Sequence, residues 1–287
     1  MRIAELYARS RPVISFEFFP PKTEVGYASL YRTIGELKRL DPGFVSVTCG
    51  AGGSTRTRTI DLVVRIQQEL GITAMAHMTC VGATREQLAE SLARIRDEGL
   101  ENVLALRGDP PRDQPEFRPV PGGFAYANEL AAFIRERFDL CIGAACHPET
   151  HPDAPSAEVD LANLARKVEA GVDFLITDLF FDPGDYFAFA ARARAAGIRV
   201  PIVPGIMPVV SGANVRRMAQ LTGARIPAAL EEQLARTGED DEATLEVGIA
   251  WATAQCRALL DGGVPGLHFY TLNRSPATRR VYENLFS

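Results

Sequence analysis

The chain of 287 residues lacks the long apolar run that a membrane-spanning helix needs. No stretch approaches the roughly 20 consecutive apolar residues that cross a bilayer, and the first six residues lack the apolar core of a signal peptide. The chain also lacks a dense basic run, and its formal net charge is −5. These absences argue against membrane and nucleic-acid partners, and we expect a cytoplasmic protein.

Cysteine and lysine are both scarce. The chain has five cysteines, an odd number: Cys49, Cys80, Cys141, Cys146 and Cys256. Most stand in apolar, strand-like runs and none has the close pair spacing of a zinc finger, so we expect reduced, buried thiols. His147 and His151 lack carboxylate or thiolate partners at ligand spacing, so we expect no metal site. The only lysines are Lys22, Lys38 and Lys167.

The apolar content that is present suffices for a large core. Hydrophobic residues make up 46% of the chain and charged residues 23%, which is typical of a globular protein. No linker, repeat or low-complexity segment marks a boundary. We therefore expect one domain over residues 1–287.

Eight short apolar runs alternate with amphipathic segments of helical length. The runs are residues 13–18, 44–48, 73–77, 103–106, 141–146, 174–177, 200–204 and 266–270. The helical segments are residues 27–40, 58–70, 85–98, 125–137, 158–170, 186–196 and 215–221, with two further helices between 226 and 261, on either side of a charged turn at 238–241.

Near-continuous apolar strands separated by helices indicate a parallel sheet that is covered on both faces. Eight such units in about 290 residues favour a closed (β/α)₈ TIM barrel, with extra helices before the last strand, over an open doubly wound sheet. No GxGxxG fingerprint follows the first strand, which argues further against a dinucleotide-binding sheet.

The first apolar run carries one carboxylate, Glu17, in the segment ISFEFFPPK. Burying a carboxylate costs several kcal/mol unless it is paired with another group, and such a cost is otherwise tolerated where the acid has a chemical role. Glu17 is therefore either a satisfied structural acid or a proton donor with a raised pKa. The local sequence leaves both interpretations open.

In a barrel, the carboxyl ends of the strands form the active-site rim. Polar or glycine residues stand at nearly every predicted strand end: Glu17, Thr48, Gly50, His77, Arg107, Gly108, Asp109, His147, His151, Asp178, Tyr270, Asn273 and Arg274. Each alone is an ordinary strand end. Their convergence on one rim predicts a site.

Three features of the sequence each have both a functional and an ordinary interpretation. In the Arg107–Gly108–Asp109 tripeptide the glycine permits close approach of a ligand to the backbone. The glycine-rich loop at 50–54 suits a phosphate or ribose contact, or is a plain turn. A polar helix face is either solvated or part of a site. Its members are Asp160, Asn163, Arg166 and Lys167.

Together these motifs closely resemble the methylenetetrahydrofolate reductase family over essentially the whole chain, in the short bacterial form that has the catalytic barrel alone. The segments that carry the resemblance are 15–22 (SFEFFPPK), 47–51 (VTCGA), 106–109 (LRGD), 147–152 (HPETHP), 180–182 (FFD), 204–208 (PGIMP) and 268–274 (HFYTLNR). Each is moderately specific, and their shared order is very specific.

The resemblance implies a barrel that carries FAD and uses NADH or NADPH to reduce 5,10-methylenetetrahydrofolate to 5-methyltetrahydrofolate, in one-carbon metabolism and methionine biosynthesis. Glu17 matches the general acid that protonates the folate N10. Asp109 matches a carboxylate that stabilises the cationic iminium and holds the pterin.

Further positions match family contacts to the two ligands. Those on the flavin side are Thr48, Cys49, Ala51, His77, Arg107, Gly108, Asp109, Tyr126, Ala127, His147, His151, Asp160, Asn163, Arg166 and Lys167. Those on the folate side are Glu17, Asp109, Asp178 and Arg274.

The chain departs from the family pattern at four positions. His147 stands where the family has tyrosine, Cys49 and Gly212 stand where it has aromatic residues, and Asp178 replaces a glutamine that hydrogen-bonds folate. An aspartate only accepts hydrogen bonds, so the substrate pose can differ.

Two alternatives stay open: direct hydride transfer from nicotinamide without flavin, and a pterin-binding barrel that transfers methyl groups. The sequence leaves the nicotinamide preference undecided, as well as the subunit number, for which a homo-oligomer is one alternative.

Overall fold

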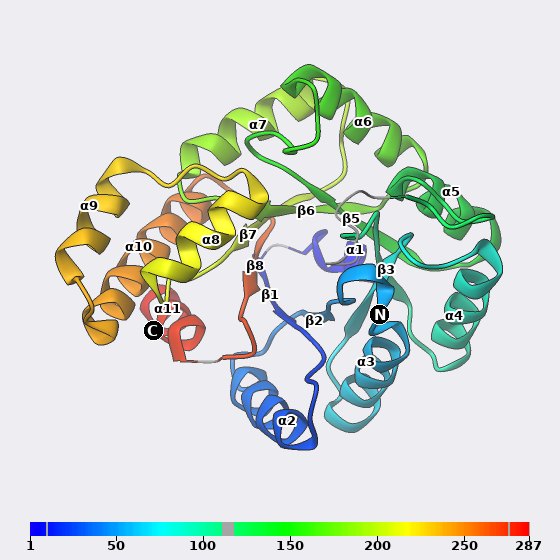
Figure 1. The fold of residues 1–287 in the computed structure, drawn as a ribbon, viewed down its shortest axis with the longest axis horizontal. Coiled ribbons are helices and arrows are strands. Elements are labelled where there is room, and N and C mark those ends of the chain that lie inside the picture. Colours follow the sequence, from blue (N-terminus) through cyan, green and yellow to red (C-terminus); the bar gives the residue numbers. More distant parts are fainter. Residues whose placement is uncertain (10, 111–117, 275, 287) are drawn as a thin grey trace.

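A computed structural model describes residues 1–9, 11–110, 118–274 and 276–286. Its strands close into one parallel barrel in the order β1 to β8, which confirms the predicted fold (Figure 1). The strands are β1 (Val13–Phe18), β2 (Phe44–Val47), β3 (Ala74–Thr79), β4 (Asn102–Leu106), β5 (Cys141–Cys146), β6 (Phe174–Leu179), β7 (Ile202–Ile206) and β8 (Gly266–Tyr270).

Most of the helices form an outer ring around the barrel, whereas α1 lies near its centre in the view (Figure 1). They are α1 (Ile3–Leu6), α2 (Glu24–Lys38), the 3₁₀ turn η1 (Ala51–Gly53), α3 (Arg56–Leu70), α4 (Arg85–Asp97), α5 (Ala127–Arg137), α6 (Ala157–Glu169), α7 (Pro183–Ala195), α8 (Gly212–Thr222), α9 (Ala228–Thr237), α10 (Asp241–Asp261) and α11 (Pro276–Phe286). The two extra helices predicted before the last strand are α9 and α10, so that prediction is confirmed. Helices α1 and α11 were not predicted. Among the described residues, none of these helices is long and apolar enough to cross a membrane.

Side-chain caps fix where several helices begin after their strands. Asp182 accepts a hydrogen bond from the Gly184 N–H and precedes Pro183 at the first turn of α7. Ser156 accepts from the Val159 N–H at the start of α6. Helix α7 therefore begins after a three-residue segment that follows β6, whereas ten residues separate β5 from α6.

Apolar side chains fill the lower part of the barrel. Phe44 and Phe174 pack edge to face inside it, at 6.4 Å between ring centroids. Helix α1 covers the amino-terminal opening, where Ile3 and Leu6 are buried against the same cluster and the Ile3 N–H donates to Asn102 Oδ1 at 2.8 Å. The interior is thereby closed at the bottom, and its polar groups face the carboxyl-terminal rim.

Two strand boundaries differ from the sequence prediction in ways that matter for the site. Strand β3 continues to Thr79, so His77 lies within the strand rather than at its end, paired with Leu104 of β4. Strand β6 continues to Leu179, with a register irregularity between Ile176 and Leu179. Pairing with the neighbouring strand sets these ends, and the apolar pattern of one strand does not reveal them.

Candidate active site

Glu17 stands at the centre of a polar cluster inside the barrel mouth. Its neighbours in register are Ser46 on β2 and Tyr270 on β8. Glu17 Oε2 lies 3.5 Å from Ser46 Oγ and 3.5 Å from His268 Nε2, and these last two atoms are also 3.5 Å apart. Ser46 and His268 are fully buried, and the Glu17 side chain keeps 17% of its surface exposed. The carboxyl is thus a buried acid with one open side.

His77 approaches the same carboxyl from β3. Its Nε2 lies 3.4 Å from Glu17 Oε2, within ion-pair distance. The angle does not make a hydrogen bond, and Nε2 has no such partner among the described residues. Burial lowers the pKa of His77 to about 4, which outweighs the opposing effect of the Glu17 charge. His77 is therefore neutral near pH 7, and the contact is between a carboxyl and a neutral imidazole.

The loop after β8 holds the backbone around Glu17. Thr271 Oγ1 donates to the Glu17 carbonyl at 2.6 Å. Asn273 accepts from the Phe19 N–H at 2.9 Å and donates to the Phe19 carbonyl at 2.8 Å. Asn273 itself has a left-handed backbone, with φ of 57°, which asparagine tolerates better than most residues. These bonds fix where the carboxyl points.

The sequence interpretation missed Ser46 and assigned no role to His268. Both are polar residues inside apolar strands, and that was the available signal. The strand register was not readable from the sequence, so their approach to Glu17 was not predicted.

The Arg107–Gly108–Asp109 segment lies at the end of β4. Arg107 donates to Asp153 Oδ2 at 2.8 Å, while the Asp109 side chain is exposed on the rim and its carbonyl accepts from the Gly52 N–H at 3.0 Å. The glycine has a packing reason of its own, and the predicted approach of a ligand to its backbone stays a prediction. Its φ is 85°, and a Cβ there would come within 2.6 Å of Val81 and 2.8 Å of Thr79.

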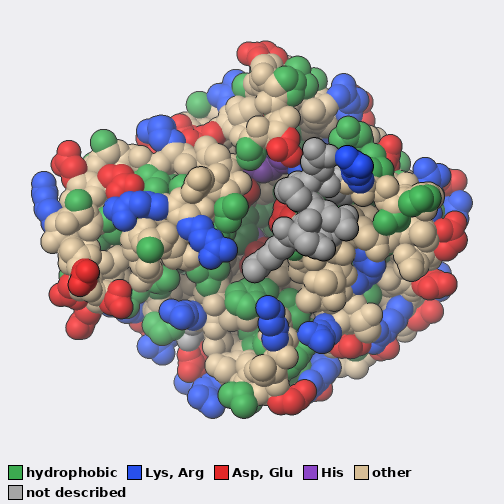
Figure 2. Space-filling model, viewed as in Figure 1, with side chains coloured by type: hydrophobic (Ala, Val, Ile, Leu, Met, Phe, Trp, Pro, Cys, Tyr) green, Lys and Arg blue, Asp and Glu red, His purple; other side chains and the backbone are tan. Residues whose placement is uncertain are grey.

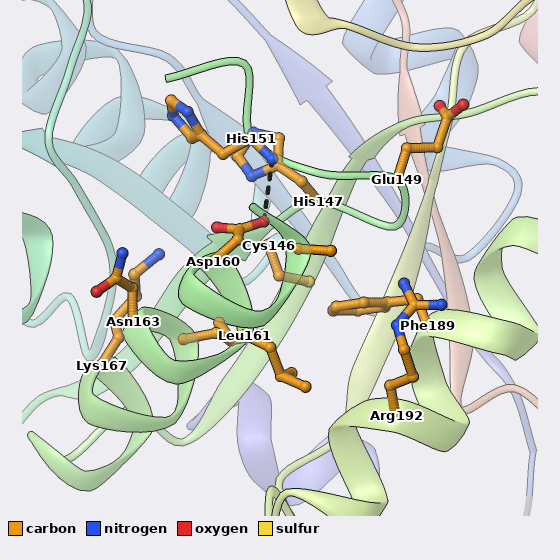
Figure 3. Close-up of a pocket in the computed structure, with 12 residues that line it drawn as sticks. Cys146, His147, Glu149, His151, Asp160, Leu161, Asn163, Lys167, Phe189 and Arg192 are labelled. Carbon is orange, nitrogen blue, oxygen red and sulfur yellow. Dashed lines mark hydrogen bonds between the residues drawn. The ribbon is translucent and has the colours of Figure 1, made fainter. Parts of the chain in front are cut away.

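A small cavity of about 50 Å³ opens between β5, α6 and α7 (Figure 3). His147 and His151 meet edge to face above it, with ring centroids 4.5 Å apart. The Asp160 carboxylate accepts a hydrogen bond from the backbone N–H of His151 at 3.0 Å. Burial lowers the pKa of His151, and the neighbouring His147 lowers it further.

Lys167 lines this cavity from α6. Its ammonium donates to the Ala145 carbonyl at 2.8 Å, and burial lowers its pKa. In the described part of the chain no carboxylate lies within ion-pair distance of it. Asn163 also lines the cavity, whereas Arg166 does not line it and instead donates to Asn163. The polar face of α6 thus splits between the cavity and the surface.

The remaining residues predicted to contact a flavin follow β2 or stand at the start of α5. The Thr48 carbonyl accepts from Thr59 Oγ1 at 2.8 Å, and Cys49 Sγ lies 3.8 Å from Thr79 Oγ1. Ala51 belongs to η1. Tyr126, immediately before α5, is 61% exposed, and Ala127 after it is buried.

Asp178 and His147 meet across the ends of β6 and β5. Their closest atoms, Oδ2 and Nε2, are 3.5 Å apart. The other oxygen of Asp178 accepts from the Leu179 N–H at 2.7 Å. The register irregularity in β6 includes Asp178, and such irregularities re-aim side chains near sites.

A larger cavity of about 590 Å³ lies on the opposite side of the mouth, among the β8 end, α8 and α10. Figure 2 shows the same view as Figure 1, with the surface hollowed near its centre. Phe19, Leu272 and Tyr270 line this cavity together with Arg274, which is exposed. Gly212 lies at the start of α8 but does not line it. Asp241 also lines the cavity, so its mainly apolar wall carries one cation and one anion. Such a wall suits a flat ring system with a charged end that Arg274 can meet.

Among the described residues, no group of three or more His, Cys, Asp or Glu side chains is placed to hold a metal ion. The described cysteines are all free thiols.

A family model described as methylenetetrahydrofolate reductase matches residues 2–286. The 5,10-methylenetetrahydrofolate reductase of Escherichia coli (strain K12) is 38% identical over 274 residues, 95% of this chain and 90% of that protein. Methylenetetrahydrofolate reductase (NADH) 1 of Arabidopsis thaliana is 39% identical over 295 residues, 99% of this chain and 50% of that protein. The chain therefore spans about half the length of the plant relatives that it matches.

Two solved structures share the barrel fold. An uncharacterized Clostridium thermocellum protein that binds two copies of 5-methyl-5,6,7,8-tetrahydrofolic acid superposes with a TM-score of 0.67 at 16% identity, over 98% of this chain and 96% of that chain. Dihydropteroate synthase from Xanthomonas albilineans gives 0.52 at 17% identity, over 96% and 91%. At such identities the likeness concerns the fold alone.

The family model matches nearly the whole chain, and the bacterial reductases from Escherichia coli and Pectobacterium carotovorum match over at least 90% of their own length. On this basis the chain belongs to the methylenetetrahydrofolate reductase family, a family of oxidoreductases.

Proposed function

We propose that the protein, as a single catalytic barrel, reduces 5,10-methylenetetrahydrofolate to 5-methyltetrahydrofolate with hydride from NADH or NADPH through FAD. The observation that carries this proposal is Glu17, a largely buried carboxyl near the carboxyl end of β1, with 17% of its side-chain surface exposed. A leaving amine needs a positioned acid, and a carboxyl held at this depth is suited to donate one proton.

The donor set of the rim fits FAD. Lys167 is a buried cation without a carboxylate partner among the described residues, and an anionic diphosphate would satisfy it. Arg107 and Arg166 supply further positive charge nearby on the chain, and the exposed Tyr126 ring offers a flat apolar surface. When bound, FAD would accept hydride from the nicotinamide and pass it to the folate.

The residues that would hold FAD come from the neighbouring strands β2 to β5, from the segments that follow them, and from α5 and α6. They are Thr48, Cys49, Ala51, His77, Arg107, Gly108, Asp109, Tyr126, Ala127, His147, His151, Asp160, Asn163, Arg166 and Lys167. The cavity among His151, Asp160 and Lys167 is small, about 50 Å³, so binding there requires the side chains around it to rearrange.

On the folate side, Glu17 would give its proton to N10 and open the five-membered ring to the iminium. Asp109, exposed at the rim, would stabilise the resulting positive charge. Asp178 would accept hydrogen bonds from the pterin, and Arg274 would meet a carboxylate of the substrate in the cavity of about 590 Å³.

A nicotinamide co-substrate has support from the names of relatives. The plant proteins of Arabidopsis thaliana and Zea mays are both named as NADH enzymes. Binding of a folate at this fold has support from the Clostridium thermocellum protein, which binds 5-methyl-5,6,7,8-tetrahydrofolic acid.

The visible absorption spectrum of the purified protein, with and without added FAD, tests the proposal. Flavin bands that NADH or NADPH bleaches without oxygen, and that 5,10-methylenetetrahydrofolate restores, are the expected result. Folate reduction by protein that never binds flavin would overturn the FAD assignment and favour direct hydride transfer. Absence of any nicotinamide-dependent folate reduction, with and without FAD, would overturn the reductase assignment and leave the methyl-transfer alternative.

A further inference from the structure

His268 lies directly beneath Glu17 and is completely buried. Its ring stacks on Phe44, with centroids 5.7 Å apart and an interplanar angle of 16°, and the Tyr270 ring meets its edge at 5.5 Å. The two ring nitrogens of His268 face polar atoms. Nε2 faces Glu17 Oε2, and Nδ1 faces Ser15 Oγ at 2.8 Å.

We infer the tautomer of His268 from the hydrogen bonds of Ser15, whose Oγ lies 2.8 Å from His268 Nδ1. The Ser15 hydroxyl donates to the Leu267 carbonyl at 3.3 Å, so its oxygen is free to accept a hydrogen bond. A neutral imidazole carries one N–H, and the Nδ1–H group would then point at Ser15. The Nε2 atom that faces Glu17 is therefore an acceptor.

Three acceptor atoms meet in the cluster of Glu17 Oε2, His268 Nε2 and Ser46 Oγ. The Ser46 hydroxyl supplies one proton, which can satisfy only one contact. If Glu17 is ionised and His268 is neutral, two lone pairs face each other across 3.5 Å. One additional proton between Glu17 and His268 removes that repulsion, because either atom can then donate to the other.

The other titratable groups around the cluster do not supply that proton. His77, which faces Glu17 from β3, is neutral near pH 7 because burial lowers its pKa to about 4. The Tyr270 hydroxyl donates to the Thr177 carbonyl at 2.6 Å, and burial raises its pKa. Only Glu17 in this cluster is open to the barrel mouth, so a shared proton can reach a substrate only through Glu17.

We propose that His268 is a positioning residue that shares one proton with Glu17 and thereby keeps the Glu17 carboxyl protonated for delivery to the folate. In the delivery step the Glu17 O–H bond breaks, an N–H bond forms at N10, and the electron pair of the O–H bond stays on the carboxylate. A proton from solvent then restores the pair. The role in delivery rests on the proposed function, whereas the sharing of the proton does not.

Nuclear magnetic resonance of the histidine side chains tests the sharing without any substrate. The chain has four histidines, so ¹⁵N-histidine labelling gives few signals, and His268→Asn assigns the one of interest. We expect the Nδ1–H tautomer near neutral pH, and a pH transition of His268 that disappears in Glu17→Gln. An Nε2–H tautomer, or a His268 titration that is identical in both proteins, would overturn the proposal.

The pH profile of folate reduction tests the role in delivery. In His268→Asn the amide replaces Nδ1 but cannot reach Glu17, and we expect a roughly 100-fold loss of kcat/KM at pH 7.5, with the alkaline limb moved to lower pH. His268→Gln places an amide where Nε2 stands and should restore most of the activity. Phe44→Leu keeps both ends of the imidazole and serves as the packing control: we expect a lower Tm and an unchanged profile.

A His268→Asn protein with the wild-type pH profile would overturn the delivery role, as would a Phe44→Leu protein that shows the same shift. A wild-type protein that reduces no folate would overturn the proposed function instead. In that case the magnetic resonance measurement still decides whether Glu17 and His268 share a proton.

Discussion

Asp178 and His147, which lie 31 residues apart in the sequence, touch each other in the structure: Asp178 Oδ2 is 3.5 Å from His147 Nε2. Neighbouring positions on β5 and β6 bring them together, because Ala145 pairs with Ile176 and Cys146 with Thr177. The two side chains therefore form one unit, in which the Asp178 carboxylate, which only accepts hydrogen bonds, faces a ring nitrogen of His147 that can donate one.

This contact predicts non-additive effects of mutation. We expect His147→Tyr to leave Asp178 without its partner and Asp178→Gln to do the same for His147, each lowering kcat/KM for the folate. The double variant should recover part of the loss, with a coupling free energy of about 1 kcal/mol. Steady-state kinetics of the four proteins measures this coupling. Strictly additive effects would contradict the idea that the pair acts as one unit.

Glu17→Gln should separate the two halves of the proposed reaction. The amide keeps the size of the side chain and a contact with Ser46 but cannot donate an acidic proton. We expect the FAD-loaded variant to oxidise the nicotinamide as before. We expect its rate of folate reduction to fall by about 100-fold or more. Stopped-flow absorbance follows each half separately. Equal loss of both halves would show that Glu17 is not the proton donor.

Lys167 should contribute to the binding of FAD. Because its buried ammonium has no carboxylate partner among the described residues, we expect Lys167→Met to weaken FAD affinity by roughly 10-fold, about 1.4 kcal/mol. Isothermal titration calorimetry measures the affinity. Lys38→Met, which removes the same charge from an exposed position on α2, is the matched control. Equal affinities of the two variants would contradict the proposed placement of the diphosphate.

His77 should make the protein less stable in mild acid. Its pKa is about 4 in the folded protein against an ordinary value of 6.5. The unfolded chain therefore binds more protons between these values, and the free energy of unfolding falls as the pH drops through them. We expect a loss of roughly 2 kcal/mol between pH 7.5 and pH 5. Urea unfolding at several pH values measures this loss.

His77→Gln is the control for this pH dependence, because it removes the titrating ring. Its free energy of unfolding should fall less steeply over the same range. His151, whose pKa burial also lowers, adds a contribution of the same sign that remains in the variant. If the free energy of unfolding of the variant falls with pH as steeply as that of the wild type, His77 is not the source of the pH dependence.

Gly108→Ala should lower the free energy of unfolding by more than the cost of placing alanine at a positive φ. The added Cβ would lie 2.6 Å from Val81 and 2.8 Å from Thr79, in a residue with φ of 85°. Gly99→Ala has a similar φ of 74° but nothing within 4 Å of the new atom, so it isolates the backbone cost of about 1 kcal/mol. We expect Gly108→Ala to lower the free energy of unfolding by roughly 2–4 kcal/mol. If chemical denaturation shows that Gly108→Ala and Gly99→Ala lower the free energy of unfolding equally, the packing explanation is wrong.

The barrel could be predicted from the sequence because each strand is a continuous apolar run and each helix has an amphipathic pattern of sufficient length. The extra helices α9 and α10 carried the same signals. Helix α1, with four residues, is too short to show a periodicity, and it forms by packing on the barrel floor. The ends of β3 and β6 depended on pairing with neighbouring strands.

For the candidate site, the sequence by itself determined which residue types stand at the strand ends, and it singled out Glu17 because a carboxylate in an apolar strand is costly. Only the tertiary structure decided what surrounds that carboxylate. Parallel register brought Ser46 and His268 to within 3.5 Å of it, and it joined His147 to Asp178. The physical reason is that alternation along a strand fixes which face a side chain occupies, whereas the closure of the barrel fixes which side chains on that face meet.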